Sequence, residues 1–173
     1  SHTNSLYIGK NQDGKTSRRD LTPQYDGYVF PKLITNNFIT TSTVLVDKEL
    51  FLQSGGFDES MEALEDWKLW LAISLLEPIA YCPKLLAKYR VSSGSTSRRA
   101  REVLPLHIKF INNFFALPST NSKYASLNNQ ALSQSYSICA YIAEDSKDST
   151  FSFICAVKSA LLSHLILSNF KII

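Results

Sequence analysis

The sequence predicts an α/β protein, arranged as α+β within this chain, on three observations. β-prone runs at residues 5–9 and 39–46 favour strands, and the second is β-branched almost throughout. Apolar residues at helical spacing fill residues 64–76, a pattern typical of a helix that is buried on nearly every side. Helical periodicity dominates residues 101–173. We therefore expect a small sheet followed by a C-terminal helical hairpin.

Turn and helix signals place further elements in the first half of the chain. The Asp-Gly pair within residues 11–14 predicts a tight turn after the first strand. Proline and glycine among aromatic residues predict a surface loop that ends in a short helix within residues 30–36. Asp47 begins a helical turn that leads to the break at Gly55-Gly56. The first half is therefore expected to alternate short strands with short helices.

The last strands of the sequence are followed by a polar loop. Two short strands are expected at residues 79–82 and 85–91, on either side of Pro83. Residues 92–99 contain only Ser, Gly, Thr and Arg, a composition that predicts a polar loop.

The remaining chain predicts helices, at residues 103–115, 124–143 and 150–167. In the last of them Phe153, Val157, Leu161 and Leu165 lie at helical spacing. We expect this apolar stripe to pack on the preceding helix, while contact with a membrane surface stays open as an alternative.

Composition excludes several classes of protein. The chain of 173 residues is 45% hydrophobic and 19% charged, which argues against disorder. A net charge of only +3 argues against a nucleic-acid partner. The three cysteines are far apart and form no CxxC pair, so we expect reduced thiols and a cytoplasmic location. No histidine has metal-ligand spacing, so no metal site is expected in this chain.

Two adjacent carboxylates stand out in the middle of the sequence. Glu65 and Asp66 follow the string Gly55-Gly56-Phe57-Asp58-Glu59 and begin the buried helix. Free backbone N–H groups and the helix dipole favour negative charge at such a position. Capping for stability alone would explain either residue taken singly, and Trp67 could simply fill the core.

The ordered string as a whole resembles the family 2 glycosyltransferases of GT-A type. Their "GGFDE" and "ED.xLWL" segments match residues 55–59 and 65–71, and Asp13-Gly14 matches their "d.dG" hairpin. Their "P..L..YR …S.S" segment is matched at the expected distance by Pro83, Leu86, Tyr89, Arg90, Ser95 and Ser97. On this resemblance residues 1–100 are the C-terminal, acceptor-side part of a GT-A domain with part of its Rossmann-like sheet. Residues 101–173 are then a helical C-terminal extension.

The resemblance also implies a reaction and its residues. The parent enzyme would transfer a sugar with inversion from a nucleotide-sugar donor to a carbohydrate or lipid-linked acceptor, as in polysaccharide biosynthesis. Asp66 would be the general base, and Glu65 would orient it or touch the acceptor. The implied substrate-binding residues are Trp67, Gly56, Asp58, Arg90 and Ser95. Arg90 and the loop with Ser95 would close over the donor diphosphate, although a structural ion pair of Arg90 is an equal alternative.

Two departures from the family pattern limit this interpretation. Ser92 and Ser93 stand where many relatives carry a His after the "YR" pair. The sequence also has no DxD motif, whose carboxylates hold Mn²⁺ or Mg²⁺ in these enzymes. We therefore expect the metal ligands and the nucleotide-binding half to lie upstream in a longer parent, and the isolated chain to be inactive.

One alternative of a different class stays open. The chain could be a non-catalytic binding or interaction module with a degenerate glycosyltransferase-like fold, which would use the helices after Asn121 for docking. Self-association is also open, because a strand at residues 39–46 without its sheet neighbours would leave an exposed edge.

Overall fold

The computed structural model describes residues 1–9, 12–91 and 99–169. The chain divides into two compact units, one formed by Ser1–Leu33 with Asn37–Ser93 and the other by Ile34–Asn36 with Gly94–Ile173. Within the described residues the first unit holds a small sheet with short helices, and the second is helical. The predicted α+β fold class is confirmed.

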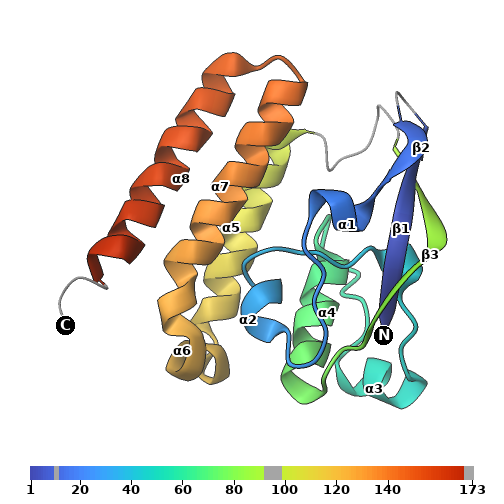
Figure 1. Ribbon diagram of the computed structural model, residues 1–173. Helices are drawn as coiled ribbons and strands as arrows, with labels where there is room; N and C mark the ends of the chain where they lie inside the picture. The colour runs from blue at the N-terminus through green and yellow to red at the C-terminus, as the bar shows by residue number, and fades with distance from the viewer. Residues whose placement is uncertain (10–11, 92–98, 170–173) are drawn as a thin grey trace. The chain divides into compact units, whose positions relative to one another are not determined.

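The sheet of the first unit has the strand order β2-β1-β3 (Figure 1). The central strand β1 (His2–Gly9) pairs antiparallel with β2 (Gln12–Ser17) and parallel with β3 (Tyr81–Arg90). The two short strands predicted around Pro83 are one strand in the structure. A register shift makes this possible, because the partners jump from Thr3–Cys82 to Asn4–Leu85 and leave Pro83 outside the ladder.

The predicted turn at residues 11–14 is too late in the sequence. Gly9 pairs with Gln12 and Ile8 pairs with Asp13, so Asp13 and Gly14 belong to β2. Gly14 has a positive φ of 73°, a backbone conformation that is common for glycine in turns. The Asp-Gly signal therefore marks an irregular strand position and not the hairpin reversal.

The strand predicted at residues 39–46 is wrong. This segment contains the 3-10 helix η1 (Thr41–Thr43) between irregular stretches. The carbonyl oxygen of Thr40 accepts hydrogen bonds from the Thr43 amide at 2.8 Å and from its hydroxyl at 2.7 Å. Such local bonds satisfy the backbone without a neighbouring strand, and threonine makes them readily. The exposed edge expected there is accordingly not formed by this segment.

The helices of the first unit surround a core of large side chains. They are α1 (Arg18–Leu21), α2 (Phe30–Leu33), α3 (Lys48–Gln53) and α4 (Glu65–Leu76), as labelled in Figure 1. Asp47 caps α3 by accepting from the amides of Glu49 and Leu50. The least exposed large side chains come mainly from α2, α4 and the segment between them: Phe30, Leu33, Phe38, Trp67, Leu69 and Leu71. The predicted buried helix is thus confirmed as α4.

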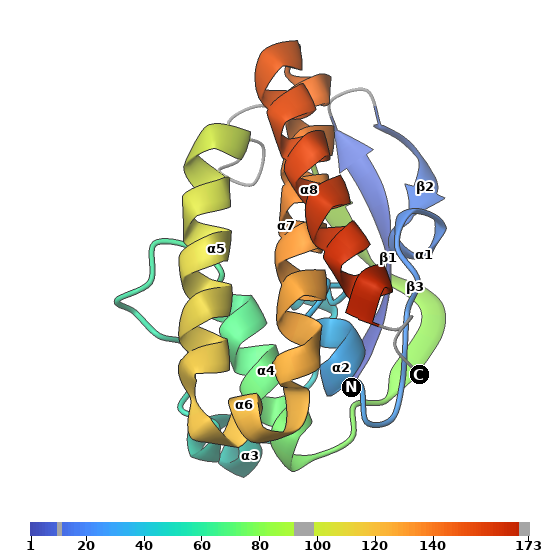
Figure 2. The same cartoon turned by 90° about the vertical axis from the view of Figure 1, so that its left-hand side faces the viewer.

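The second unit contains α5 (Ala100–Ala116), α6 (Pro118–Tyr124), the 3-10 helix η3 (Ala125–Leu127), α7 (Asn128–Asp145) and α8 (Ser149–Asn169). The long helices α5, α7 and α8 confirm the helical prediction, and α7 packs against both of the others (Figures 1 and 2). Their shared core joins Val103 and Leu104 to Cys139, Ala143 and Cys155. The cysteines are free thiols.

The prediction of which face of α8 packs on α7 is wrong. Phe153, Val157 and Leu161 are exposed, so the stripe that they form does not pack on α7. Leu165, the fourth residue of the predicted stripe, lies outside the described side chains. The contacts with α7 come from another face of the helix, which carries small and hydroxyl side chains. Among the described residues, no helix has the length and apolar content needed to cross a membrane.

A buried histidine in the second unit should make stability depend on pH. His107 on α5 lies with Nδ1 3.4 Å from the hydroxyl oxygen of Ser135, and burial lowers its pKa to about 4. An unfolded histidine has a pKa of about 6.5, so between these values the unfolded chain binds the proton more readily. The stabilisation of the folded chain by a neutral His107 is therefore complete above about pH 6.5, and it is lost as the pH falls towards 4. We expect a loss of about 2–3 kcal/mol between pH 7 and pH 4.5.

Urea unfolding at these two pH values measures this loss in the wild type and in His107→Gln. The difference between the two pH values should shrink in that variant. His164→Gln, at an exposed position on α8, controls for the loss of a histidine as such. Equal pH dependence in the wild type and His107→Gln would show that His107 is not the group responsible.

Candidate functional site

The site is built at the N-terminus of α4. Leu64 precedes the helix with φ of 69°, an uncommon value for a residue that is not glycine. Glu65 and Asp66 occupy the first helical turn as half-buried side chains. The N-terminus of a helix favours negative charge, as the sequence predicts.

Both oxygens of the Asp66 carboxylate are held. Oδ1 accepts a hydrogen bond from the Trp67 amide at 2.6 Å, and Oδ2 accepts one from the Thr41 hydroxyl at 2.5 Å. Thr41 belongs to η1, the segment that was predicted as a strand. The sequence analysis therefore missed Thr41, and the only signal that could have indicated it is the run of hydroxyl residues at positions 40–43.

Trp67 fixes the rotation of α4. The side chain is 1% exposed, and its indole N–H donates to the carbonyl oxygen of Leu33 at 2.8 Å. The structure thus places Trp67 in the core, which is the alternative that the sequence left open. Because neighbouring residues of a helix point in different directions, burying Trp67 leaves Asp66 at the boundary with solvent.

The Gly55–Glu59 turn is fastened beside the same helix. Gly55 and Gly56 have φ of 90° and 62°, and a Cβ on Gly56 would lie 3.3 Å from the Phe51 ring. The Phe57 ring makes edge contacts with Phe51 on α3 and with Trp70 on α4, at centroid distances of 5.6 and 6.0 Å. The turn is therefore pinned between α3 and α4.

Asp58 is bound within this turn by an ion pair. Its Oδ2 lies 2.6 Å from Nζ of Lys68, and its Oδ1 accepts from the amide and hydroxyl of Ser60. The ammonium of Lys68, followed by Ser60, lowers the pKa of Asp58 to about 2. Asp58 thus stays ionised and ties the turn to α4. Lys68 is a second residue that the sequence analysis missed.

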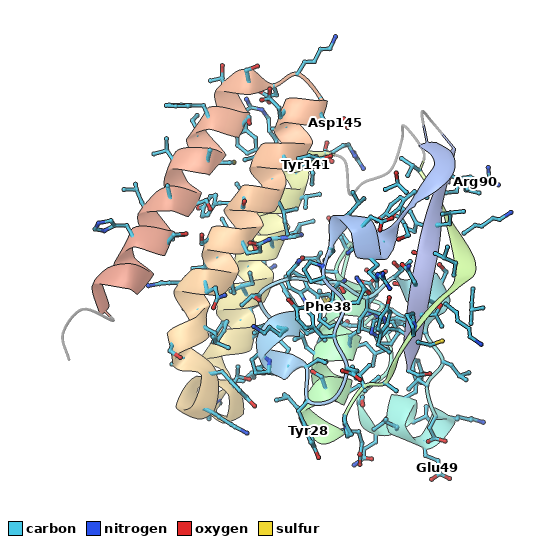
Figure 3. All side chains as sticks on the ribbon, in the orientation of Figure 1. Tyr28, Phe38, Glu49, Arg90, Tyr141 and Asp145 are labelled. Atoms are coloured by element: carbon cyan, nitrogen blue, oxygen red, sulfur yellow. The ribbon has the colours of Figure 1, made fainter. Side chains whose placement is uncertain are left out.

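The other predicted site residues are not brought to Asp66 by a described contact. Arg90 is exposed at the end of β3 (Figure 3), where it is registered with Ile8 of β1. Ser95 lies outside the described residues. Across the described part of the chain, no three His, Cys, Asp or Glu side chains form a group that could hold a metal ion.

Comparison with known proteins adds a relationship to this geometry. No family model matches the chain, and no solved structure matches it. Two curated proteins do match, an uncharacterized glycosyltransferase of Rickettsia felis and the uncharacterized glycosyltransferase RC0461 of Rickettsia conorii. Each is 33% identical over 97 residues, which are 56% of this chain. The chain is related to glycosyltransferases. It spans only 16% of the length of these two relatives.

The hydrogen bond of Trp67 should be measurable as stability. Trp67→Phe removes the indole N–H and leaves the buried Leu33 carbonyl without that donor. Trp70→Phe is the matched control, because Trp70 is 3% exposed and its indole nitrogen has no hydrogen-bond partner. We expect Trp67→Phe to lower the free energy of unfolding by about 1–2 kcal/mol more than Trp70→Phe, measured in urea. Equal losses would mean that the bond adds nothing beyond packing.

Proposed function

We propose that this chain carries the acceptor side and the catalytic base of an inverting glycosyltransferase of family 2 and GT-A type. The observation that supports this most is the Asp66 carboxylate, which is held at both oxygens at the N-terminus of α4 and stays half-buried at the boundary with solvent. The relationship to glycosyltransferases and the ordered segments at residues 55–59 and 65–71 support the same proposal.

In the proposed reaction Asp66 accepts the proton of the acceptor hydroxyl. The acceptor oxygen forms a bond to the anomeric carbon, and the bond from that carbon to the donor diphosphate breaks, with its electron pair leaving on the phosphate oxygen. The hydroxyl proton becomes acidic as this bond forms, so a carboxylate that stays ionised is a sufficient base. The Thr41 hydroxyl and the Trp67 amide fix the direction of the Asp66 carboxylate.

The other parts of the proposal concern substrates. Glu65, beside the base, would orient the acceptor, and the turn with Gly56 and Asp58 would shape the acceptor side. Arg90 and Ser95 would contact the diphosphate of a nucleotide-sugar, because guanidinium and hydroxyl donors suit phosphate oxygens. The acceptor would be a carbohydrate or a lipid-linked sugar at the cytoplasmic side. Any Mn²⁺ or Mg²⁺ would be held by residues outside this chain, so no step assigned to this chain depends on it.

Replacement of Asp66 tests the base. The chain is expressed in its complete natural polypeptide and assayed for release of nucleoside diphosphate from a panel of UDP-, GDP- and dTDP-sugars, with lipid and oligosaccharide extracts of the source organism as acceptors. Asp66→Asn keeps the shape but cannot take the proton, so kcat should fall by about 10² to 10⁴ with little change in KM for the donor. Glu62→Gln, at an exposed position outside the site, should keep wild-type turnover.

The outcomes of this assay separate the hypotheses. Full turnover in Asp66→Asn would remove Asp66 as the base while leaving the transferase proposal in place. A wild-type protein that releases no nucleoside diphosphate from any donor would contradict the transferase proposal and favour the non-catalytic module.

Thr41 gives a second test through the same assay. Thr41→Val keeps the shape of the side chain but cannot donate to Asp66, so one carboxylate oxygen is no longer fixed. A single hydrogen bond of this kind is worth about 1–1.5 kcal/mol, so kcat should fall about tenfold while KM for the donor is unchanged. Thr41→Ser keeps the hydroxyl and should restore most of the rate. A serine variant as slow as the valine variant would mean that Thr41 acts through packing instead.

A further inference from the structure

The pair of helices α7 and α8 has its polar side chains on the inside. The hydroxyl oxygen of Ser133 on α7 lies 3.1 Å from that of Ser159 and 2.8 Å from that of Ser163, both on α8. Ser152 of α8 donates to the carbonyl oxygen of Ala140 at 3.0 Å. The buried residues of α7 are all small: Ala131, Ser133, Ser135, Cys139 and Ala143. Hydroxyl groups and small side chains therefore make much of the contact between the two helices, beside the larger Tyr136 of α7 and Phe151 of α8.

Four large apolar side chains of α8 are on the outside. Phe153, Val157 and Leu161, spaced four residues apart, are 71%, 41% and 61% exposed, and Ile154 beside them is 44% exposed. A helix on a water-facing surface normally directs its apolar face to the core and its polar face outwards. In α8 an apolar face is directed outwards instead, so this outer face is suited to an apolar environment.

Composition favours lipid over protein as this environment. Small residues and hydroxyl hydrogen bonds between helices, with large apolar residues facing outwards, are the arrangement of helix pairs packed in lipid. Among residues 149–164, the only side chain with a formal charge is Lys158. Its Nζ lies 5.4 Å from the centre of the Tyr136 ring on α7. The apolar stripe itself thus offers no charge to a charged partner.

The area of the stripe argues against a second copy of the chain. Its four side chains expose about 400 Å², taking on the order of 200 Å² for a large side chain. Two copies in contact would bury about 800 Å², and stable specific interfaces bury about 1,200 Å² or more. A lipid surface has no such threshold, because it needs no matching shape.

We infer that the outer face of α8, formed by Phe153, Ile154, Val157 and Leu161, binds a neutral lipid surface, with the helix lying along that surface. Since the described helices are not suited to cross a membrane, the contact is peripheral. This inference does not depend on Asp66, which belongs to the other unit.

Flotation with vesicles tests the inference on the 173-residue chain. The probes are vesicles of phosphatidylcholine alone and vesicles in which about a third of the lipid is phosphatidylglycerol. We expect the chain to float with both, and about 0.5 M salt to leave binding unchanged, because salt screens charges and not apolar contact. Phe153→Gln and Leu161→Gln should each weaken partitioning about tenfold. Leu52→Gln is the matched control, since Leu52 is a 62% exposed leucine on α3.

Several results would overturn the inference. These are a wild-type chain that stays with the soluble fraction, a Leu161→Gln variant that floats like the wild type, and binding that high salt abolishes. A wild-type dimer in light scattering that Leu161→Gln converts to a monomer would identify a second copy as the partner instead. Circular dichroism of both variants checks that the helices remain folded. None of these results bears on sugar transfer, so the proposed function is tested separately.

Discussion

The buried hydrogen bond from the Trp67 indole to the Leu33 carbonyl is the constraint on which the site depends. It ties α4 to the end of α2 and sets the rotation of the first turn of α4. With Trp67 turned into the core, Asp66 lies where one carboxylate oxygen reaches the Thr41 hydroxyl. A helix rotated by one residue would bury the carboxylate and expose the indole. The geometry of the site is therefore a consequence of core packing.

Two carboxylates near the start of α4 have different surroundings. Asp58 is paired with the Lys68 ammonium, which compensates its charge and lowers its pKa to about 2. The described contacts of Asp66 are with neutral donors, an amide and a hydroxyl. Such donors stabilise a carboxylate without cancelling its charge. This contrast favours a structural role for Asp58, which ties the turn to α4.

The parts of the fold that the sequence predicted are those set by local pattern. Apolar spacing predicted α4 and the position of Asp66 at its start, whereas the proposed role of Asp66 followed from the resemblance. The β-branched run at residues 39–46 led to a wrong strand prediction. Strand propensity describes how well a side chain suits a sheet, and it does not indicate whether a neighbouring strand is available for pairing. Thr41 was missed for the same reason. The Asp58–Lys68 pair joins residues ten positions apart, and the segment between them, which includes Leu64 with its positive φ, brings them together.

Helix α8 shows a further limit of pattern reading. The spacing of Phe153, Val157 and Leu161 predicted an apolar face correctly, but periodicity does not say on which side the neighbouring helix lies. In the structure α8 faces α7 with the side that makes hydroxyl contacts with Ser133. Small residues of α7 allow the two helices to approach closely there. The serine hydroxyls between α7 and α8 are hydrogen-bonded to one another, so the contact between these helices does not require the apolar face of α8. That face remains free for an environment outside the unit.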